Sequence, residues 1–272
     1  MRRRWRAARD EQSGVAIPRP QPTLLRNNMS RLLGKHSFGS AIGRLGHLVR
    51  TLGVAKTCGT LVSALDDKYF KTFDRRYGVR TCGYVTLDQT GFTRERLRDA
   101  TNYSPTNGWA VRRMLRLWQP PHEARFADLG CGMGRTCLLA AEYGFASVTG
   151  VELAPELCAI ARDNLARCRW PAGRRSDVVI RHEDALDYCA GTEDDVFYMF
   201  RPFSGDFLRR ILDRLGARAR ARQRELTVIY SERAGLPGDY AALIAAHGAF
   251  IKQRELVCLG QAFHYFTTIY IR

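Results

Sequence analysis

The chain has 272 residues, of which 45% are hydrophobic, and its formal net charge is +16 at pH 7. This apolar fraction can build a sizeable core, and no uncharged apolar run reaches the roughly 18 residues of a membrane-spanning helix. The basic excess favours an acidic partner such as nucleic acid or an anionic membrane surface. The eight cysteines show neither a CxxC pair nor a secretory signal pattern, so we expect reduced thiols in a cytoplasmic protein.

Residues 1–57 are interpreted as a basic N-terminal arm. They hold 12 of the 43 Lys and Arg residues and 2 of the 27 Asp and Glu residues. Proline recurs at positions 18, 20 and 22, and such a segment buries little surface, so we expect partial disorder. A short amphipathic helix is predicted within residues 31–57. A solvated tail, a nucleic-acid contact, an anionic-membrane contact and an organelle-targeting peptide remain open for the arm.

Residues 58–122 are expected to form a helical lid, or N-terminal extension. Aromatic and charged residues are dense over residues 68–90, and a turn followed by a helix is predicted over residues 100–118, with Ser104 or Asn107 as the cap. We expect this helix to lie over the mouth of a ligand pocket, because it precedes the first strand. Tyr103, in the turn, is a candidate for catalysis or ligand contact, and the alternative is a packing role.

The sequence FADLGCGMG at residues 126–134 predicts a buried strand, a glycine turn and the start of a helix over residues 135–143. Glycines alternate at positions 130, 132 and 134, which removes side chains where the backbone turns tightly and approaches a ligand. Asp128 places one carboxylate beside this turn. The pattern predicts a binding site at the end of the first strand.

Strands and helices then alternate, which predicts an α/β fold with a parallel sheet covered on both faces. We expect a doubly wound, mostly parallel seven-stranded sheet with an antiparallel C-terminal edge hairpin, in a domain at residues 123–272. The basic run at residues 217–224 is interpreted as a solvated loop. Further strands are predicted at residues 147–152, 177–181, 195–200, 226–230, 250–258 and 263–271, and helices at residues 155–168, 207–215 and 240–247.

Three acidic residues follow strands of this sheet, where ligands of open parallel sheets bind. Glu152, at the end of the second strand, can accept hydrogen bonds from both ribose hydroxyls of an adenosyl group. Asp184, followed by the small Ala185, can accept from the adenine amino group, and Asp128 lies near the amino end of a methionine moiety. A dinucleotide is the rival ligand, but Arg135 occupies the place of the third glycine in GxGxxG. The pattern therefore favours S-adenosylmethionine.

On these residues the chain resembles class I S-adenosylmethionine-dependent methyltransferases, which have a Rossmann-like fold. DLGCGMG at 128–134, GVELAPEL at 150–157, HEDALDY at 182–188 and DDVFYMFRPF at 194–203 match the family's motifs. Residues 74–88 and 102–107 are similar to a bacterial group of largely unassigned substrate. The resemblance implies methyl transfer and the following cofactor contacts: Asp128, Gly130, Cys131, Gly132, Gly134, Glu152, Leu153, Asp184, Ala185 and Phe200.

One position departs from the family. Members of this group tend to carry Asn-Pro-Phe after the fourth strand, and this chain has Arg201 there. Arginine has no hydrogen-bond acceptor, so it cannot hold an amino substrate as asparagine does. Arg201 is therefore interpreted as a contact for an acidic acceptor or as a solvent-facing side chain. A small molecule or a protein side chain is favoured over nucleic acid as the acceptor.

Two other functions stay open at this point: a non-catalytic adenosylmethionine-binding protein and an NAD-dependent oxidoreductase. Tyr198 and His264 are conceivable general bases, with core or rim positions as the alternative. We expect no metal site, because the histidines form no pair with cysteines or acids at ligand spacing. The main chain of Cys131 is expected to matter more than its thiol.

Overall fold

The computed structural model describes residues 71–83, 85, 102–173, 175–201, 203, 205–233, 240–258 and 261–268. All of them belong to one compact unit, Ala55–Arg272. The predicted basic arm and the amphipathic helix at residues 31–57 lie outside the described residues. The division into arm, extension and domain therefore stays a prediction.

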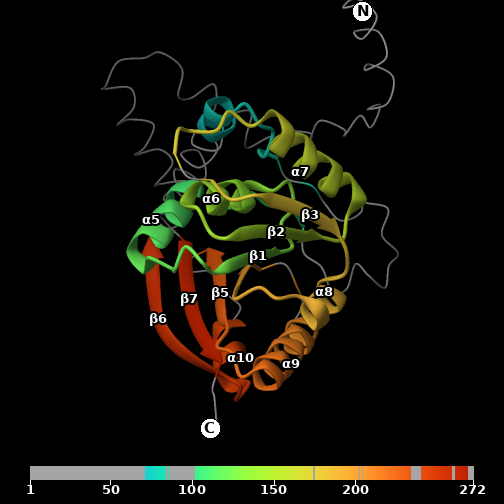
Figure 1. Cartoon of the computed structure of the whole chain (residues 1–272), viewed down its shortest axis with the longest axis vertical. Helices are drawn as coiled ribbons and strands as arrows, with labels where there is room; N and C mark the ends of the chain where they lie inside the picture. Colours follow the sequence, from blue (N-terminus) through green and yellow to red (C-terminus); the bar gives the residue numbers. More distant parts are fainter. Residues whose placement is uncertain are drawn as a thin grey trace, which may run out of the picture. The chain divides into compact units, whose positions relative to one another are not determined.

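Seven strands form one mixed sheet in the order β3-β2-β1-β4-β5-β7-β6 (Figure 1). The pairs from β3 to β5 are parallel, and β7 pairs antiparallel with both β5 and β6. The predicted seven-stranded sheet with an antiparallel edge hairpin is confirmed. The strands are β1 Arg125–Leu129, β2 Ser147–Glu152, β3 Val178–His182, β4 Val196–Phe200, β5 Thr227–Arg233, β6 Phe250–Cys258 and β7 Gln261–Thr268.

Helices cover both faces of this sheet. Side chains alternate along each strand, so Phe126 of β1 joins a core with α5, α6 and α7, whereas its neighbour Ala127 joins a core with α8, α9 and α10. Within the described part of the chain, none of the helices is long and apolar enough to cross a membrane. They are α5 Gly108–Trp118, α6 Arg135–Tyr143, α7 Pro155–Arg167, α8 Ala185–Gly191, α9 Gly205–Arg222 and α10 Tyr240–Ala246, and residues 71–77 are also helical.

The order of the strands fixes where a ligand site can form. β1 lies in the middle, with β2 and β3 on one side and β4 and β5 on the other. The chain direction across the sheet therefore reverses between β1 and β4, and the loops that follow these two strands diverge. In open parallel sheets this switch point opens a crevice at the carboxyl ends of the strands.

The predicted solvated loop at residues 217–224 is wrong for most of its length, because α9 continues to Arg222. Alanine and arginine both favour helix, and Arg218 is not in solvent. Its Nη2 donates to the carbonyl of Asp194 at 2.7 Å, and its guanidinium lies 5.6 Å from the ring centre of Phe197. A residue that was interpreted as part of a charged surface thus helps to fasten α9 to the sheet.

Candidate active site

The glycine turn has the backbone that its sequence predicts. Gly130, Gly132 and Gly134 have φ values of 79°, 55° and 84°, which lie in the left-handed region that side chains rarely adopt. The amides of Gly130 and Cys131 donate to the carbonyl of Val151 at 2.9 and 3.0 Å, so the turn is tied to the end of β2. Gly130 is exposed at the end of β1, and residues 131–134 of the turn are buried.

Glu152 lies at the end of β2 and accepts three main-chain hydrogen bonds. Its Oε2 accepts from the amide of Gly132 at 2.9 Å, and its Oε1 accepts from Leu153 and Ala154 at 2.8 and 2.9 Å. Burial raises the pKa of this carboxyl, and the main-chain donors oppose that rise. A carboxylate has about four acceptor positions, so a ligand hydroxyl can still bind.

Asp128 and Asp184 have different surroundings. Asp128 is 3% exposed, and burial followed by the charge of Glu152 raises the pKa of its carboxyl to about 8. Asp184 is half-buried and caps α8, where its Oδ1 accepts from the amide of Leu186 at 2.8 Å. The amide of Glu183 donates to the carbonyl of Glu152 at 3.2 Å, so the three acids lie along adjoining strand ends.

Residues 71–83 and 102–107, which we call the cover segment, pack against the first turn of α6 through Arg135. This side chain is 2% exposed. Its Nη2 lies 3.2 Å from Asp74 Oδ1, its Nε donates to Thr81 Oγ1 at 2.7 Å, and its Nη1 donates to the carbonyl of Thr106 at 3.2 Å. The sequence analysis used only the bulk of Arg135 and missed the role of Asp74, whose signals were the dense charge of residues 68–90 and the resemblance of residues 74–88 to a bacterial group.

Tyr103 belongs to the cover segment and lies on the glycine turn. A Cβ added to Gly132 would lie 2.2 Å from Tyr103 Cε2, so the ring touches the bare main chain there. The hydroxyl donates to the carbonyl of Thr81 at 2.8 Å, and burial raises the pKa of this phenol. The geometry gives Tyr103 a covering position, and its catalytic role stays a prediction.

Arg201 directly follows Phe200, the half-buried last residue of β4. Its φ is 45°, and a left-handed backbone costs a residue with a side chain roughly 1–2 kcal/mol. The half-buried guanidinium lies 5.8 Å from the ring centre of Tyr240. Burial raises the pKa of the neighbouring Tyr230, and the charge of Arg201 opposes that rise. Arg201 therefore lies among aromatic rings at the strand ends.

The two conceivable bases are buried side chains. Tyr198 is 0% exposed and pairs in register with Asp128 across β1 and β4. His264 is 6% exposed, with Nε2 3.2 Å from Glu232 and Nδ1 3.3 Å from Glu255. Both imidazole nitrogens therefore face carboxylates of neighbouring strands. These positions match the interpretation of Tyr198 and His264 as core residues.

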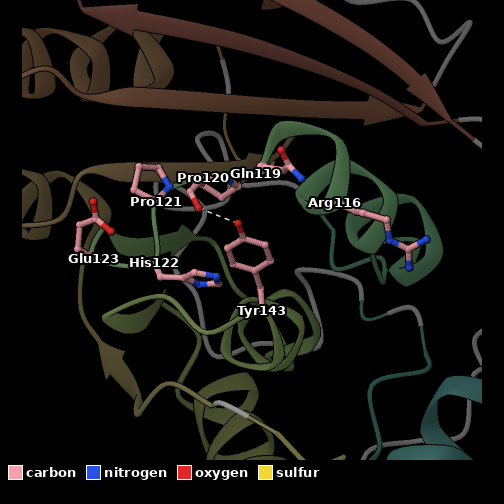
Figure 2. Close-up of a pocket in the computed structure, with 7 residues that line it drawn as sticks. All are labelled: Arg116, Gln119, Pro120, Pro121, His122, Glu123 and Tyr143. Carbon is pink, nitrogen blue, oxygen red and sulfur yellow. Dashed lines mark hydrogen bonds between the residues drawn. The ribbon is translucent and has the colours of Figure 1, made fainter.

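An open pocket of about 520 Å³ lies elsewhere (Figure 2). The hydroxyl of Tyr143 donates to the carbonyl of Pro120 at 2.7 Å within it. Most of the residues that line it precede β1, whereas the glycine turn follows β1. The pocket therefore lies at the amino end of this strand, and the glycine turn lies at its carboxyl end. It is lined by Arg116, Gln119, Pro120, Pro121, His122, Glu123 and Tyr143.

A family model described as a methyltransferase domain matches residues 126–221, from β1 into α9. The match includes the glycine turn, Glu152, Asp184 and Arg201. The chain contains a class I, S-adenosylmethionine-dependent methyltransferase domain. Its cofactor is S-adenosylmethionine, and the nicotinamide alternative gains no support.

Solved structures similar to this methyltransferase domain include three with stated functions, and no curated protein matches the chain. A ribosomal protein L11 methylase from Lactobacillus delbrueckii subsp. bulgaricus is 15% identical, with a TM-score of 0.47 over 62% of this chain and 81% of that one. An RNA methyltransferase from Salinibacter ruber in complex with S-adenosyl-L-homocysteine is 21% identical. Its TM-score is 0.43, and the match covers 61% of this chain and 94% of that one. A TehB-like S-adenosylmethionine-dependent methyltransferase from Corynebacterium glutamicum is 18% identical. Its TM-score is 0.40, and the match covers 58% of this chain and 88% of that one.

The residues at the crevice fit this cofactor. The glycine turn has no side chain at Gly130, Gly132 and Gly134, and at Gly132 the ring of Tyr103 already occupies the place that a Cβ would take. Glu152 keeps room for a hydroxyl donor at the end of β2. Asp128 is a buried carboxyl to which the described residues bring no cation, and the amino group of a methionine moiety is a cation.

Proposed function

We propose that the chain transfers a methyl group from S-adenosylmethionine to a small molecule or a protein side chain that carries an acidic group. The observation behind this proposal is the position of Arg201 directly after β4, with its guanidinium beside Tyr240. Guanidinium binds carboxylate and phosphate through paired donors and accepts no hydrogen bond. An acidic group on the acceptor therefore suits this position better than the amino group of a base.

We further propose how the predicted residues share the cofactor. The main chain of Gly130, Cys131, Gly132 and Gly134 would run along the methionine part, with Asp128 toward its amino group. Glu152 would accept from the ribose. Leu153, Asp184 and Ala185 would border the adenine, and Phe200 would lie toward the methyl group. The support for this assignment is that the turn, Glu152 and Asp184 lie at adjoining strand ends.

When bound, the cofactor supplies a methyl group already activated on a cationic sulfur. The protein mainly aligns the acceptor and excludes water. Tyr103 covers the glycine turn, and Arg201 would orient the acceptor through its acidic group. An ionised acceptor oxygen needs no base, which agrees with the burial of Tyr198 and His264 among other side chains.

Labelling separates the proposed acceptor class from the alternatives. The protein is incubated with radiolabelled S-adenosylmethionine and a fractionated lysate, and label is measured in protein, RNA and small molecules. We expect label in protein or small molecules, and at least a tenfold loss of it in Arg201→Ala, with calorimetric affinity for adenosylhomocysteine unchanged. Label in RNA would contradict the acceptor class, and binding without any transfer would favour the non-catalytic alternative.

A further inference from the structure

Two carboxylates near the glycine turn, the partly buried Asp74 and the buried Asp128, have opposite hydrogen-bond surroundings. Asp74 faces Arg135 at 3.2 Å and accepts from the amide of Thr81 at 2.8 Å, from its hydroxyl at 2.6 Å and from the amide of Cys82 at 2.8 Å. Among the described residues, Asp128 receives one hydrogen bond, from the thiol of Cys137 at 3.8 Å. A thiol is a weak donor, so the described residues give Asp74 a cation and three strong donors, and give Asp128 one weak donor and no cation.

In the described part of the chain, the groups that face Asp128 are uncharged or acidic. They come from each element packed against the end of β1: Cys137 from α6, Cys131 from the glycine turn, Glu152 from β2 and Tyr198 from β4. A buried carboxylate with no cation is costly, and the usual response is that the group takes up a proton. The nearby carboxylate of Glu152 acts in the same direction.

We infer that Asp128 is uncharged in the ligand-free protein, and that it releases its proton to solvent when the ammonium group of the cofactor binds beside it. This inference rests on the proposed cofactor site. No other bond changes in the step: the O–H bond of the carboxyl breaks, the proton passes to buffer, and the carboxylate pairs with the ammonium. Asp128 would then make the site specific for ligands that carry this cation.

The direction of the titration agrees with the geometry. Burial raises the pKa of Asp128 to about 8, so at pH 6.5 the carboxyl of the free protein is almost fully protonated. A cation within about 4–6 Å lowers the pKa of a carboxyl by about 1–3 units. Binding of a ligand with an ammonium group should therefore expel part of one proton near neutral pH, and an adenosyl ligand without an ammonium group should expel none.

Calorimetry in buffers of different ionisation enthalpy measures this proton. With adenosylhomocysteine at pH 6.5 we expect release of about 0.2 to 0.9 of a proton from the wild type, for a pKa lowered by about 1–3 units. We expect release near zero from Asp128→Asn, and wild-type release from the matched control Asp187→Asn, an exposed acid on α8. 5′-Methylthioadenosine, which lacks the amino acid end, should release no proton. Equal release from wild type and Asp128→Asn, or none from the wild type, would overturn the inference.

A second measurement needs no ligand. An unfolded aspartate has a pKa near 3.9, and the folded value is raised, so between these values the native state binds more protons and Asp128 makes stability fall as pH rises. From pH 5 to 7, Asp128 should raise the unfolding equilibrium constant by up to about tenfold for each unit of pH. Urea titrations should show a shallower fall for Asp128→Asn.

The two measurements also separate this inference from the proposed function. Identical pH slopes in wild type and Asp128→Asn would show an ionised Asp128 and overturn the inference, whatever the ligand does. Failure of adenosylhomocysteine to bind the wild type would instead contradict the proposed cofactor site, and the pH slopes would still decide the charge of Asp128.

Discussion

The proposed cofactor half of the site, after β1 and β2, and the proposed acceptor half, after β4 and β5, hold their polar groups by different means. In the cofactor half, main-chain amides hold the carboxylate in place: Glu152 accepts from the amides of Gly132, Leu153 and Ala154. In the acceptor half, Arg201 lies on a left-handed backbone beside the ring of Tyr240. Substitutions that change only side chains should therefore alter the acceptor half far more easily than the turn.

The largest expected effect concerns the cover segment. Replacing Arg135 with Met leaves Asp74 partly buried without its cation, and breaking a buried ion pair in this way costs about 3–5 kcal/mol. Urea denaturation measures the loss. The control is Arg167→Met, because Arg167 pairs with Asp163 at an exposed site where the expected change is about 0–1 kcal/mol.

Equal losses in Arg135→Met and Arg167→Met would show that the cover segment does not depend on the buried pair. The cofactor half would then owe its geometry to the glycine turn alone. A loss confined to Arg135→Met would instead mean that both the turn and a long-range ion pair hold this half together.

The next largest expected effect comes from adding a single methyl group to the glycine turn, in Gly132→Ala. Ala at position 132 would need a φ near 55° and would place its Cβ 2.2 Å from the ring of Tyr103. We expect affinity for adenosylhomocysteine to fall about a hundredfold, which corresponds to about 2.7 kcal/mol. The matched control is Gly191→Ala at the end of α8, where an added Cβ meets nothing within 4 Å.

The double variant Gly132→Ala/Tyr103→Ala removes the clash between the added Cβ and the ring of Tyr103, and keeps the backbone strain at position 132. It should recover part of the affinity. If Gly132→Ala binds as tightly as the wild type, the turn is not the main-chain cradle of the cofactor half, and the contrast between the two halves fails.

The sequence was informative where structure follows from local pattern. The succession of strand and helix patterns predicted the parallel sheet, and the three glycines predicted a tight turn, at which the structure has left-handed φ values. It was less informative where distant segments meet. Asp74 and Arg135 lie 61 positions apart, and neither neighbourhood signals the other. The extension of α9 was missed because arginine was interpreted as solvent-facing, whereas Arg218 packs on Phe197.

The acceptor half shows the same limit more sharply. Arg201 was identified as a departure from the family pattern, but nothing local predicts a left-handed arginine or its position beside Tyr240, 39 residues further on. Specificity depends on such contacts between distant segments, so a motif match can predict the cofactor and give no information on the acceptor.

The smallest expected effect on the fold comes from Arg201→Gly. Glycine relieves a strain of about 1–2 kcal/mol, and this gain is offset by the lost contact with Tyr240 and the greater chain entropy of glycine, about 0.5–1 kcal/mol each. We expect unfolding free energy within about 0.5 kcal/mol of the wild type, cofactor affinity within twofold, and methyl transfer reduced at least tenfold, with partial retention in Arg201→Lys. Denaturation, calorimetry and label transfer measure the three quantities. A destabilisation above about 1.5 kcal/mol would make Arg201 a structural residue, because the lost contacts of its side chain would then outweigh the relieved backbone strain.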